Sequence, residues 1–228
     1  SLKNIHYPHT TLQMNMAQKR LRFEELFQLQ LRMQYNKSKR KHLQNGFRWN
    51  LVGDVLNTFY TEALPFKLTE AQKRVVKEIH ADLRSGKQMN RLLQGDVGSG
   101  KTIVALMVML IATGNGFQSC LMAPTEILAQ QHYLGLKKLL EHLPVKIKIL
   151  TGSTRTADRK VLLHELKNGE LNILVGTHAL IEDNVVFNNL GLVVIDEQHR
   201  FGVEQRSKLW AKSKILMPHV LIMSATPI

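Results

Sequence analysis

The sequence holds a single cysteine, Cys120, so no disulfide can form within the chain, and no cluster of cysteines and histidines has zinc-ligand spacing. Cys120 lies in the apolar run 119–122 and is predicted to be a small buried core residue. Long apolar runs are also missing: the longest, 103–112, is far below the ~20 residues that a transmembrane helix needs. The first residues form no apolar signal segment. We therefore expect a protein of the reducing cytoplasm with no membrane contact.

Acidic residues are few as well. The chain of 228 residues has 31 Lys and Arg against 18 Asp and Glu, a formal net charge of +13 at pH 7. The excess is concentrated at the start, because residues 1–50 hold ten basic and two acidic residues. Small acidic ligands rarely require so much positive charge, whereas a polyphosphate backbone does, so the composition favours a nucleic-acid partner. A solvated, solubilising face is the alternative, above all for the N-terminal segment.

One glycine-rich stretch fills every fixed position of the phosphate-binding pattern G-x-x-x-x-G-K-[ST]. It consists of Gly95, Asp96, Val97, Gly98, Ser99, Gly100, Lys101 and Thr102. A predicted strand over 89–94 precedes it and an apolar helical run over 103–110 follows, which is the setting that the motif needs. Backbone N–H groups of such a loop can converge on an anion, Lys101 would reach the β- and γ-phosphates, and the Thr102 hydroxyl would bind Mg²⁺. The alternative is a glycine-rich turn without a ligand.

Apolar, β-branched strands alternate with helical patterns after this loop. Strands are predicted over 117–123, 145–150, 171–176, 190–195 and 219–224, and helices over 126–142 and 156–167. This alternation predicts an α/β fold with a mostly parallel sheet, helices on both faces, and ligands at the carboxyl ends of the strands. Before the loop, the patterns predict an irregular start over 1–11, a long amphipathic helix from about 12 to 43, a short helix around 52–60, and a helix over 70–83 capped by Thr69.

The strand over 190–195 delivers two adjacent carboxylates, Asp196 and Glu197. Two acids at a buried strand tip are costly unless a cation neutralises them, so we assign Asp196 to Mg²⁺ and Glu197 to orienting or deprotonating the attacking water. A turn or helix-capping pair is the alternative. Four other strand tips carry small and hydroxyl residues suited to phosphate oxygens, in 123–126, 151–153, 176–178 and 224–227.

These strings, in this order, resemble the first motor lobe of superfamily 2 helicases and translocases. Residues 95–102 are similar to motif I, 123–132 to motif Ia, 151–153 to motif Ib, 196–199 to the D-E-x-H motif II, and 224–226 to motif III. Within that superfamily the chain resembles the RecG family of bacterial branch-migration helicases over about residues 60–228, in 64–72, 93–102, 123–132, 176–180 and 196–206. Residues 22–27 are similar to the linker that precedes the motor of that family.

The resemblance implies a RecA-like, ATP-binding motor lobe over 61–228, preceded by a basic helical linker over 1–60. It implies an ATP- and Mg²⁺-dependent translocase on duplex DNA that acts as a monomer on branched DNA, replication forks and Holliday junctions in repair and recombination. Gln72 would recognise adenine. The residues implied along the DNA backbone are Thr125, Gly152, Ser153, Thr177 and His178. Those implied in coupling nucleotide state to DNA grip are Gln198, His199, Ser224, Ala225 and Thr226.

The second motor lobe and the wedge domain of that family have no counterpart in these residues, so we expect a fragment that binds nucleotide weakly, hydrolyses little and unwinds nothing. Three alternatives remain open: the motor lobe of a transcription-repair coupling translocase, a non-helicase P-loop ATPase or nucleotide kinase, and a DNA-binding module with a relic loop. Salt-dependent DNA binding would separate the helicases from the other P-loop proteins, and Mg²⁺-dependent nucleotide binding would exclude the relic.

Overall fold

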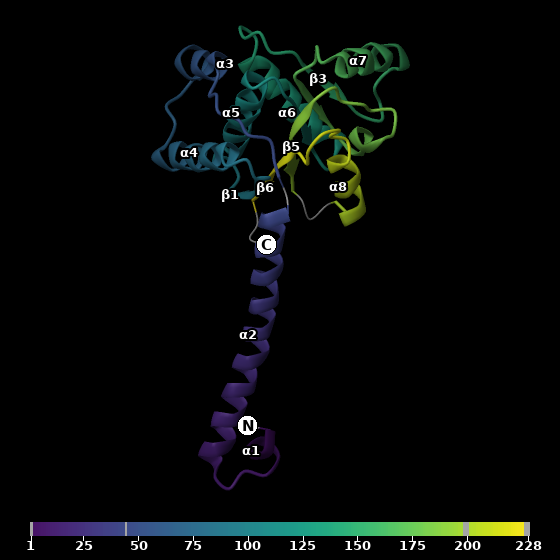
Figure 1. Cartoon of the computed structure of the whole chain (residues 1–228). Coiled ribbons are helices and arrows are strands. Elements are labelled where there is room, and N and C mark those ends of the chain that lie inside the picture. The colour runs from purple at the N-terminus through teal and green to yellow at the C-terminus, as the bar shows by residue number, and fades with distance from the viewer. Residues whose placement is uncertain (1, 44, 198–200, 226–228) are drawn as a thin grey trace. The chain divides into compact units, whose positions relative to one another are not determined.

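The computed structural model in Figure 1 describes residues 2–43, 45–197 and 201–225. The chain divides into two compact units, Ser1–Gln44 and Asn45–Ile228. Residues 45–60 belong structurally to the second unit, because Trp49 and Phe59 are fully buried in its core. The functional division at residue 60 stays a prediction.

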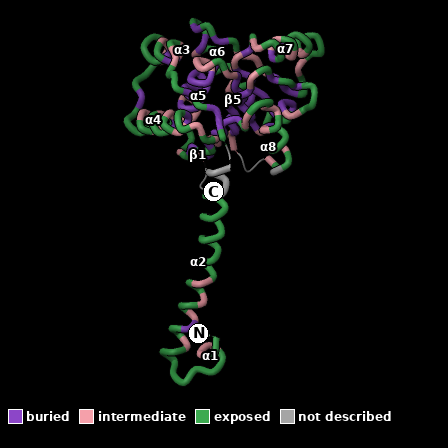
Figure 2. Tube along the Cα trace, in the orientation of Figure 1, coloured by how far each residue is buried: buried purple, intermediate pink, exposed green. Residues whose placement is uncertain are grey.

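The first unit consists of two helices, α1 (Leu2–His6) and α2 (Thr11–Leu43). The irregular start predicted for residues 1–11 is therefore wrong over α1; the helix ends just before Pro8, which has no backbone N–H and restricts the residue before it. The long helix is confirmed. Its predicted apolar stripe is 53–69% exposed, and Figure 2 shows exposed residues along most of α2. The stripe consists of Leu12, Met16, Phe23, Leu26, Phe27, Leu31 and Tyr35, and its partner stays a prediction.

The second unit is built on a six-stranded parallel sheet. Its strands are β1 (Asn90–Gln94), β2 (Gln118–Met122), β3 (Ile147–Leu150), β4 (Ile173–Gly176), β5 (Leu190–Asp196) and β6 (His219–Ser224). They lie in the order β1-β6-β5-β2-β4-β3, and every neighbouring pair is parallel. The predicted α/β class and all six strands are confirmed, with ends that shift by at most two residues.

The helices of this unit include every helix predicted for it. They are α3 (Asp54–Thr58), the π-helical turn η1 (Phe59–Ala63), α4 (Glu70–Arg84), α5 (Lys101–Gly114), α6 (Glu126–Leu139), α7 (Thr156–Asn168), the 3₁₀ turn η2 (His178–Ile181) and α8 (Val203–Trp210). Two of them, η2 and α8, were not predicted, because their short sequences carry too few apolar positions to show a helical period.

No helix among the described residues has both the length and the apolarity to cross a membrane.

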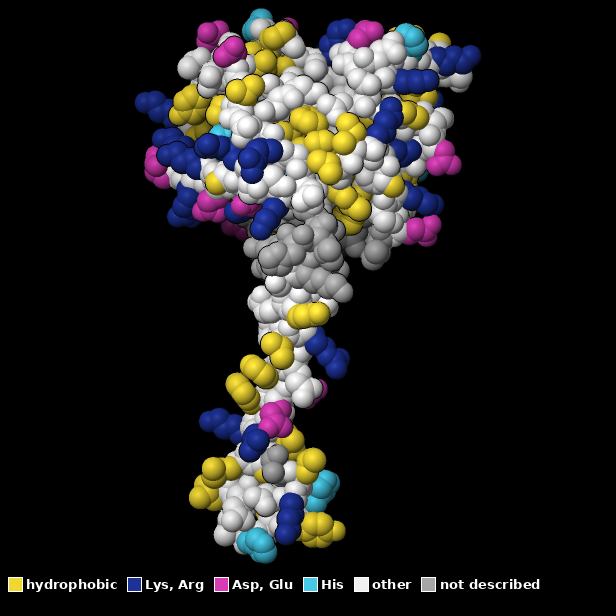
Figure 3. Space-filling view, viewed as in Figure 1, with side chains coloured by type: hydrophobic (Ala, Val, Ile, Leu, Met, Phe, Trp, Pro, Cys, Tyr) yellow, Lys and Arg dark blue, Asp and Glu magenta, His cyan; other side chains and the backbone are white. Residues whose placement is uncertain are grey.

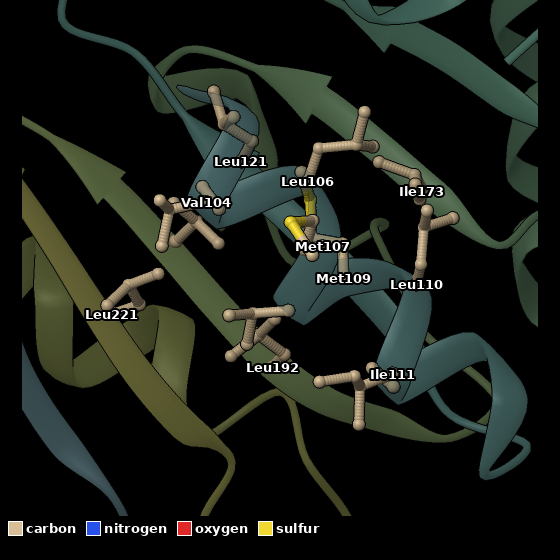
Figure 4. Packing of buried hydrophobic residues seen from close by; sticks show 14 of the residues in the cluster. Val104, Leu106, Met107, Met109, Leu110, Ile111, Leu121, Ile173, Leu192 and Leu221 are labelled. Atoms are coloured by element: carbon tan, nitrogen blue, oxygen red, sulfur yellow. The ribbon is translucent and has the colours of Figure 1, made fainter. Parts of the chain in front are cut away.

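Helices cover both faces of the sheet, as predicted. Strand β5 shows this most directly: Leu192 and Val194 point into one apolar cluster, whereas Val193 and Ile195 point into the other. The first cluster contains α5, which is buried over nearly its whole length and packs against Leu121, Leu192 and Leu221 (Figure 4). The second cluster contains α7, α8 and η2. Burial on both faces explains why the strands read as unbroken apolar runs.

A buried histidine at the start of β6 binds both the residue before β1 and the segment around Phe47. His219 is fully buried; its Nδ1 accepts the Met89 N–H at 3.0 Å, and its Nε2–H donates to the Phe47 carbonyl at 3.0 Å. This pair of bonds requires the neutral ring. Burial lowers the pKa of His219 to about 4, although the Phe47 carbonyl favours the charged form.

We expect this histidine to make the second unit acid-sensitive. The folded-state pKa lies below the unfolded value of about 6.5, so its contribution is complete above pH 6.5 and is lost as the pH falls towards 4. At pH 5 the loss is about 2 kcal/mol of unfolding free energy. Urea unfolding at pH 7 and pH 5 measures it, and His219→Gln, which keeps a donor and an acceptor but does not titrate, should show a smaller difference. Equal differences in both proteins would refute this account.

Candidate functional site

All six strands end at one level on one edge of the sheet. The strand register runs without interruption across that edge, through the pairs Gln94–Ser224, Met223–Asp196, Ile195–Met122, Met122–Gly176 and Gly176–Leu150. The residues after these ends are those that the sequence singled out. The strand order also divides them: the phosphate loop, the acidic pair and Ser224 lie at the ends of β1, β5 and β6, whereas the predicted DNA contacts follow β2, β4 and β3.

The phosphate loop joins β1 to α5 and starts directly beside β6. The Gly95 N–H donates to the Ser224 carbonyl, and Gly100 at the N-cap of α5 has φ of 82°, a conformation that favours glycine. The Lys101 ammonium donates to two carbonyl oxygens of the loop itself, at 2.6 Å to Gly95 and 2.9 Å to Asp96. Lys101 therefore sits inside its own loop as a cation held by neutral oxygens. This arrangement suits the arrival of an anion.

Gln72 contacts the phosphate loop from α4. Its Oε1 accepts the Thr69 N–H at 2.9 Å and the Thr69 hydroxyl accepts the Gln72 N–H, which forms a capping box and confirms Thr69 as the N-cap. Its Nε2 donates to the Ser99 carbonyl at 2.9 Å. A Cβ on Gly100 would come within 2.3 Å of this Nε2 and displace it, and the φ of 82° would strain any side chain there. Gln72 thus lies at the predicted nucleotide site, and its recognition of adenine stays a prediction.

The acidic pair ends β5 in a strained conformation. Glu197 has φ of 50°, a value that non-glycine residues rarely adopt. Residues in such strained conformations are found most often at functional sites. Its carboxylate accepts the Ala225 N–H at 3.1 Å and the Ser224 hydroxyl at 3.3 Å. The tips of β5 and β6 are thereby linked, and the coupling role of Ser224 and Ala225 stays a prediction. The other predicted coupling residues, Gln198, His199 and Thr226, lie outside the described residues.

Three of the predicted DNA-contacting residues are exposed at the loops after β2 and β3. Thr125 caps α6 by accepting the Leu128 N–H, and Gly152 and Ser153 follow β3. The Ser153 hydroxyl donates to Glu126 at 2.8 Å, which ties the two loops together. A groove of about 380 Å³ lies between them, lined by Glu126, Ile127, Gln130, Gln131, Leu134, Thr151 and Ser153.

The loop after β4 presents its two predicted contacts differently. His178 is exposed at the start of η2. Thr177 is only 2% exposed, and its hydroxyl has no hydrogen-bond partner among the described residues. A side-chain contact from Thr177 to DNA would therefore need a local rearrangement, and its role stays a prediction.

One contact at this edge was missed by the sequence reasoning. The Nε2–H of His132, on α6, donates to Asp196 Oδ2 at 2.8 Å, and both side chains are 14% exposed. The only sequence signal was the spacing, because His132 lies two helical turns after Thr125 and so faces the same way. The contact joins the two halves of the edge.

The residues at β1 and β5 fit a magnesium-bound nucleotide. Three observations of the structure support this: the inward Lys101 cation, the positive φ of Gly98 and Gly100 in the loop, and the position of Thr102 in the N-terminal turn of α5. No group of three or more histidine, cysteine or acidic side chains among the described residues could hold a metal alone. Mg²⁺ does not require one, since it is commonly held by one or two protein ligands, phosphate oxygens and water.

Comparison with known proteins decides the family. The sequence model of the DEAD/DEAH box helicases matches residues 69–228, which contain the phosphate loop, the acidic pair and every strand of the sheet. The chain belongs to the DEAD/DEAH box helicase family. Membership implies the use of ATP and favours a helicase lobe over a nucleotide kinase, while Mg²⁺-dependent nucleotide binding remains the test for a relic loop.

Among relatives of this helicase lobe, the ATP-dependent DNA helicases RecG of Synechocystis sp. and Bacillus subtilis are each 50% identical to it over the whole chain. A solved structure of RecG bound to a three-way DNA junction matches 99% of the chain with 44% identity and a TM-score of 0.83. These matches confirm the resemblance to RecG and favour it over the transcription-repair coupling translocases. The helicase MrfA, at 19% identity and a TM-score of 0.61, shares the fold. The chain spans 27% and 33% of the length of the two RecG relatives.

Proposed function

We propose that this chain is the ATP-binding motor lobe of a RecG-type DNA helicase, which remodels replication forks and Holliday junctions in DNA repair and recombination. The observation that carries the proposal is the single edge on which β1 and β5 present a phosphate loop and an acidic pair, while β2, β4 and β3 present hydroxyls and small residues. We further propose that the protein works in the cytoplasm as a monomer. The 44–50% identity to RecG proteins over nearly the whole chain supports the assignment to a RecG-type motor lobe.

The nucleotide half of the edge would work as follows. Lys101 would exchange its two loop carbonyls for the β- and γ-phosphates, because an ammonium binds an anionic oxygen more strongly than a neutral one. The Thr102 hydroxyl and Asp196 would hold Mg²⁺, which neutralises charge on the phosphate oxygens. Glu197 would orient the attacking water, and its bonds to Ser224 and Ala225 carry any shift of its carboxylate to β6. That link is the predicted coupling route from hydrolysis to movement.

The other half of the edge would follow a DNA backbone. Helix α6 presents its N-terminus at this edge, and Glu126 in its first turn is tied to Ser153, so the N-terminus of α6 and the loop after β3 would face the same phosphate path. A second groove of about 510 Å³ shares Leu134 with the first and is lined in part by Lys137, Lys138, Lys146 and Lys148. Figure 3 shows lysine and arginine side chains distributed over the visible face of this unit. Such contacts would recognise the charge and shape of the DNA backbone and would not recognise its base sequence.

We expect the chain to bind duplex DNA with an affinity that falls linearly on a log–log plot against salt, because each neutralised phosphate releases counterions. Lys138→Ala removes one charge from the lysine-lined second groove, into which the path would continue from the carboxyl edge, and should reduce the slope by about 1. Lys77→Ala removes an exposed charge from α4 and serves as the matched control. Fluorescence anisotropy with a labelled fork at several salt concentrations measures both. Binding without salt dependence, or equal slopes in the two variants, would contradict the proposed path.

A further inference from the structure

Helix α6 carries His132, which contacts the acidic strand tip. The bond from His132 Nε2–H to Asp196 Oδ2 is 2.8 Å long, and both side chains are largely shielded from water. An ionised carboxylate only accepts hydrogen bonds, so the ring must present its proton at Nε2. The bond engages one oxygen of Asp196, and the other oxygen accepts no side-chain hydrogen bond among the described residues.

The same helix also reaches the proposed DNA path. Thr125 caps α6, and Glu126 in its first turn accepts a hydrogen bond from Ser153 after β3. Seven residues separate Thr125 from His132, which places them about 10 Å apart along nearly the same face of the helix. A displacement of the N-terminal turn of α6 therefore reaches Asp196 through a single rigid element and one hydrogen bond.

We propose that His132 is a positioning residue: it holds the Asp196 carboxylate in the orientation that a magnesium-bound nucleotide needs, and it ties that orientation to the seating of α6 on DNA. The inference rests on the proposed function. Its physical basis is general, because hydrogen-bond partners of metal-binding carboxylates commonly change metal affinity 10–100-fold. His132 thus complements the link between Glu197 and β6, since it connects the other carboxylate of the pair to the other half of the edge.

The first experiment measures Mg²⁺-dependent binding of a fluorescent ADP analogue to the 228-residue chain. In His132→Ala the Mg²⁺ concentration for half-saturation should rise about 10-fold, while affinity for metal-free ADP stays unchanged. His132→Gln places an amide N–H at a similar reach and should recover most of the loss. His142→Ala, in the exposed segment after α6, is the matched control and should bind as the wild type does.

The outcomes separate this inference from the proposed function. If the wild-type chain binds no nucleotide with or without Mg²⁺, the proposed function fails and the inference falls with it. If the wild type shows Mg²⁺-dependent binding and His132→Ala has an equal or lower Mg²⁺ requirement, only the inference is overturned. Equal weakening of metal-free ADP binding in both His132 variants would also overturn it, because that result indicates a role in folding alone.

The second experiment tests the tie to DNA in the complete helicase. Magnesium–nucleotide affinity is measured with and without a forked duplex, and the ratio of the two gives a coupling factor that linkage makes reciprocal. His132→Ala should bring this factor close to one, and His132→Gln should restore it, while DNA affinity in the absence of nucleotide stays as in the wild type. An unchanged coupling factor in His132→Ala would overturn the proposed tie.

Discussion

Replacement of Lys101 by alanine is expected to abolish measurable nucleotide binding while the fold stays intact. The ammonium is the cation within the phosphate loop, and truncation of one partner of a shielded charge pair commonly costs about 2–5 kcal/mol, or about 30- to 5,000-fold in affinity. The fold should tolerate the change, because the amine makes two hydrogen bonds to loop carbonyls and forms no ion pair among the described residues.

Calorimetric titration with ADP and Mg²⁺ measures the affinity, and thermal unfolding checks the fold. Lys160→Ala is the matched control, since it removes one positive charge from an exposed position of α7. The control should bind ADP as the wild type does. If Lys101→Ala kept the wild-type affinity, the assignment of the loop to phosphate would be wrong, whatever the family.

The fold was predictable because the residues that build it repeat a simple signal. Each strand is an apolar run bounded by turn residues. The runs are unbroken because alternate residues of a strand such as β5 pack into two apolar clusters, one on each face of the sheet. The positions of the two site halves followed from the rule that ligands gather at the carboxyl ends of parallel strands. What the sequence could not supply was the order of the strands, which separates the phosphate loop from the DNA-contacting loops.

The contacts that the sequence did not reveal all depend on tertiary placement. Trp49 and Phe59 belong to the core of the second unit, although the sequence predicted a linker there. No local pattern shows that such a segment will pack against the rest of the unit. The bond between His132 and Asp196 spans 64 positions. Glu197 in the left-handed region is likewise imposed by its neighbours on β6, and not by its own preference.

Taken alone, this 228-residue chain is expected to hydrolyse ATP about 10³-fold or more slowly than the complete helicase, and to unwind no DNA. The residues proposed for hydrolysis, Lys101, Thr102, Asp196 and Glu197, all lie along one edge of one sheet, so they approach the triphosphate from one side. In related enzymes an arginine brought to the other side by a second domain is worth about 10³–10⁵ in rate. Binding should persist, because the loop and the acidic pair are both present on this lobe.

A coupled ATPase assay at saturating forked DNA measures the difference, with Lys101→Ala of the same chain as the background. The decisive comparison is between turnover and binding. We expect Mg²⁺-ADP to bind with an affinity that calorimetry can measure, and the ATPase rate to stay near that of the Lys101→Ala chain. Vigorous DNA-stimulated turnover by the chain alone would show that one edge suffices for the chemistry. In that case the water-orienting role of Glu197 would have to account for most of the rate, and Glu197→Gln would abolish it.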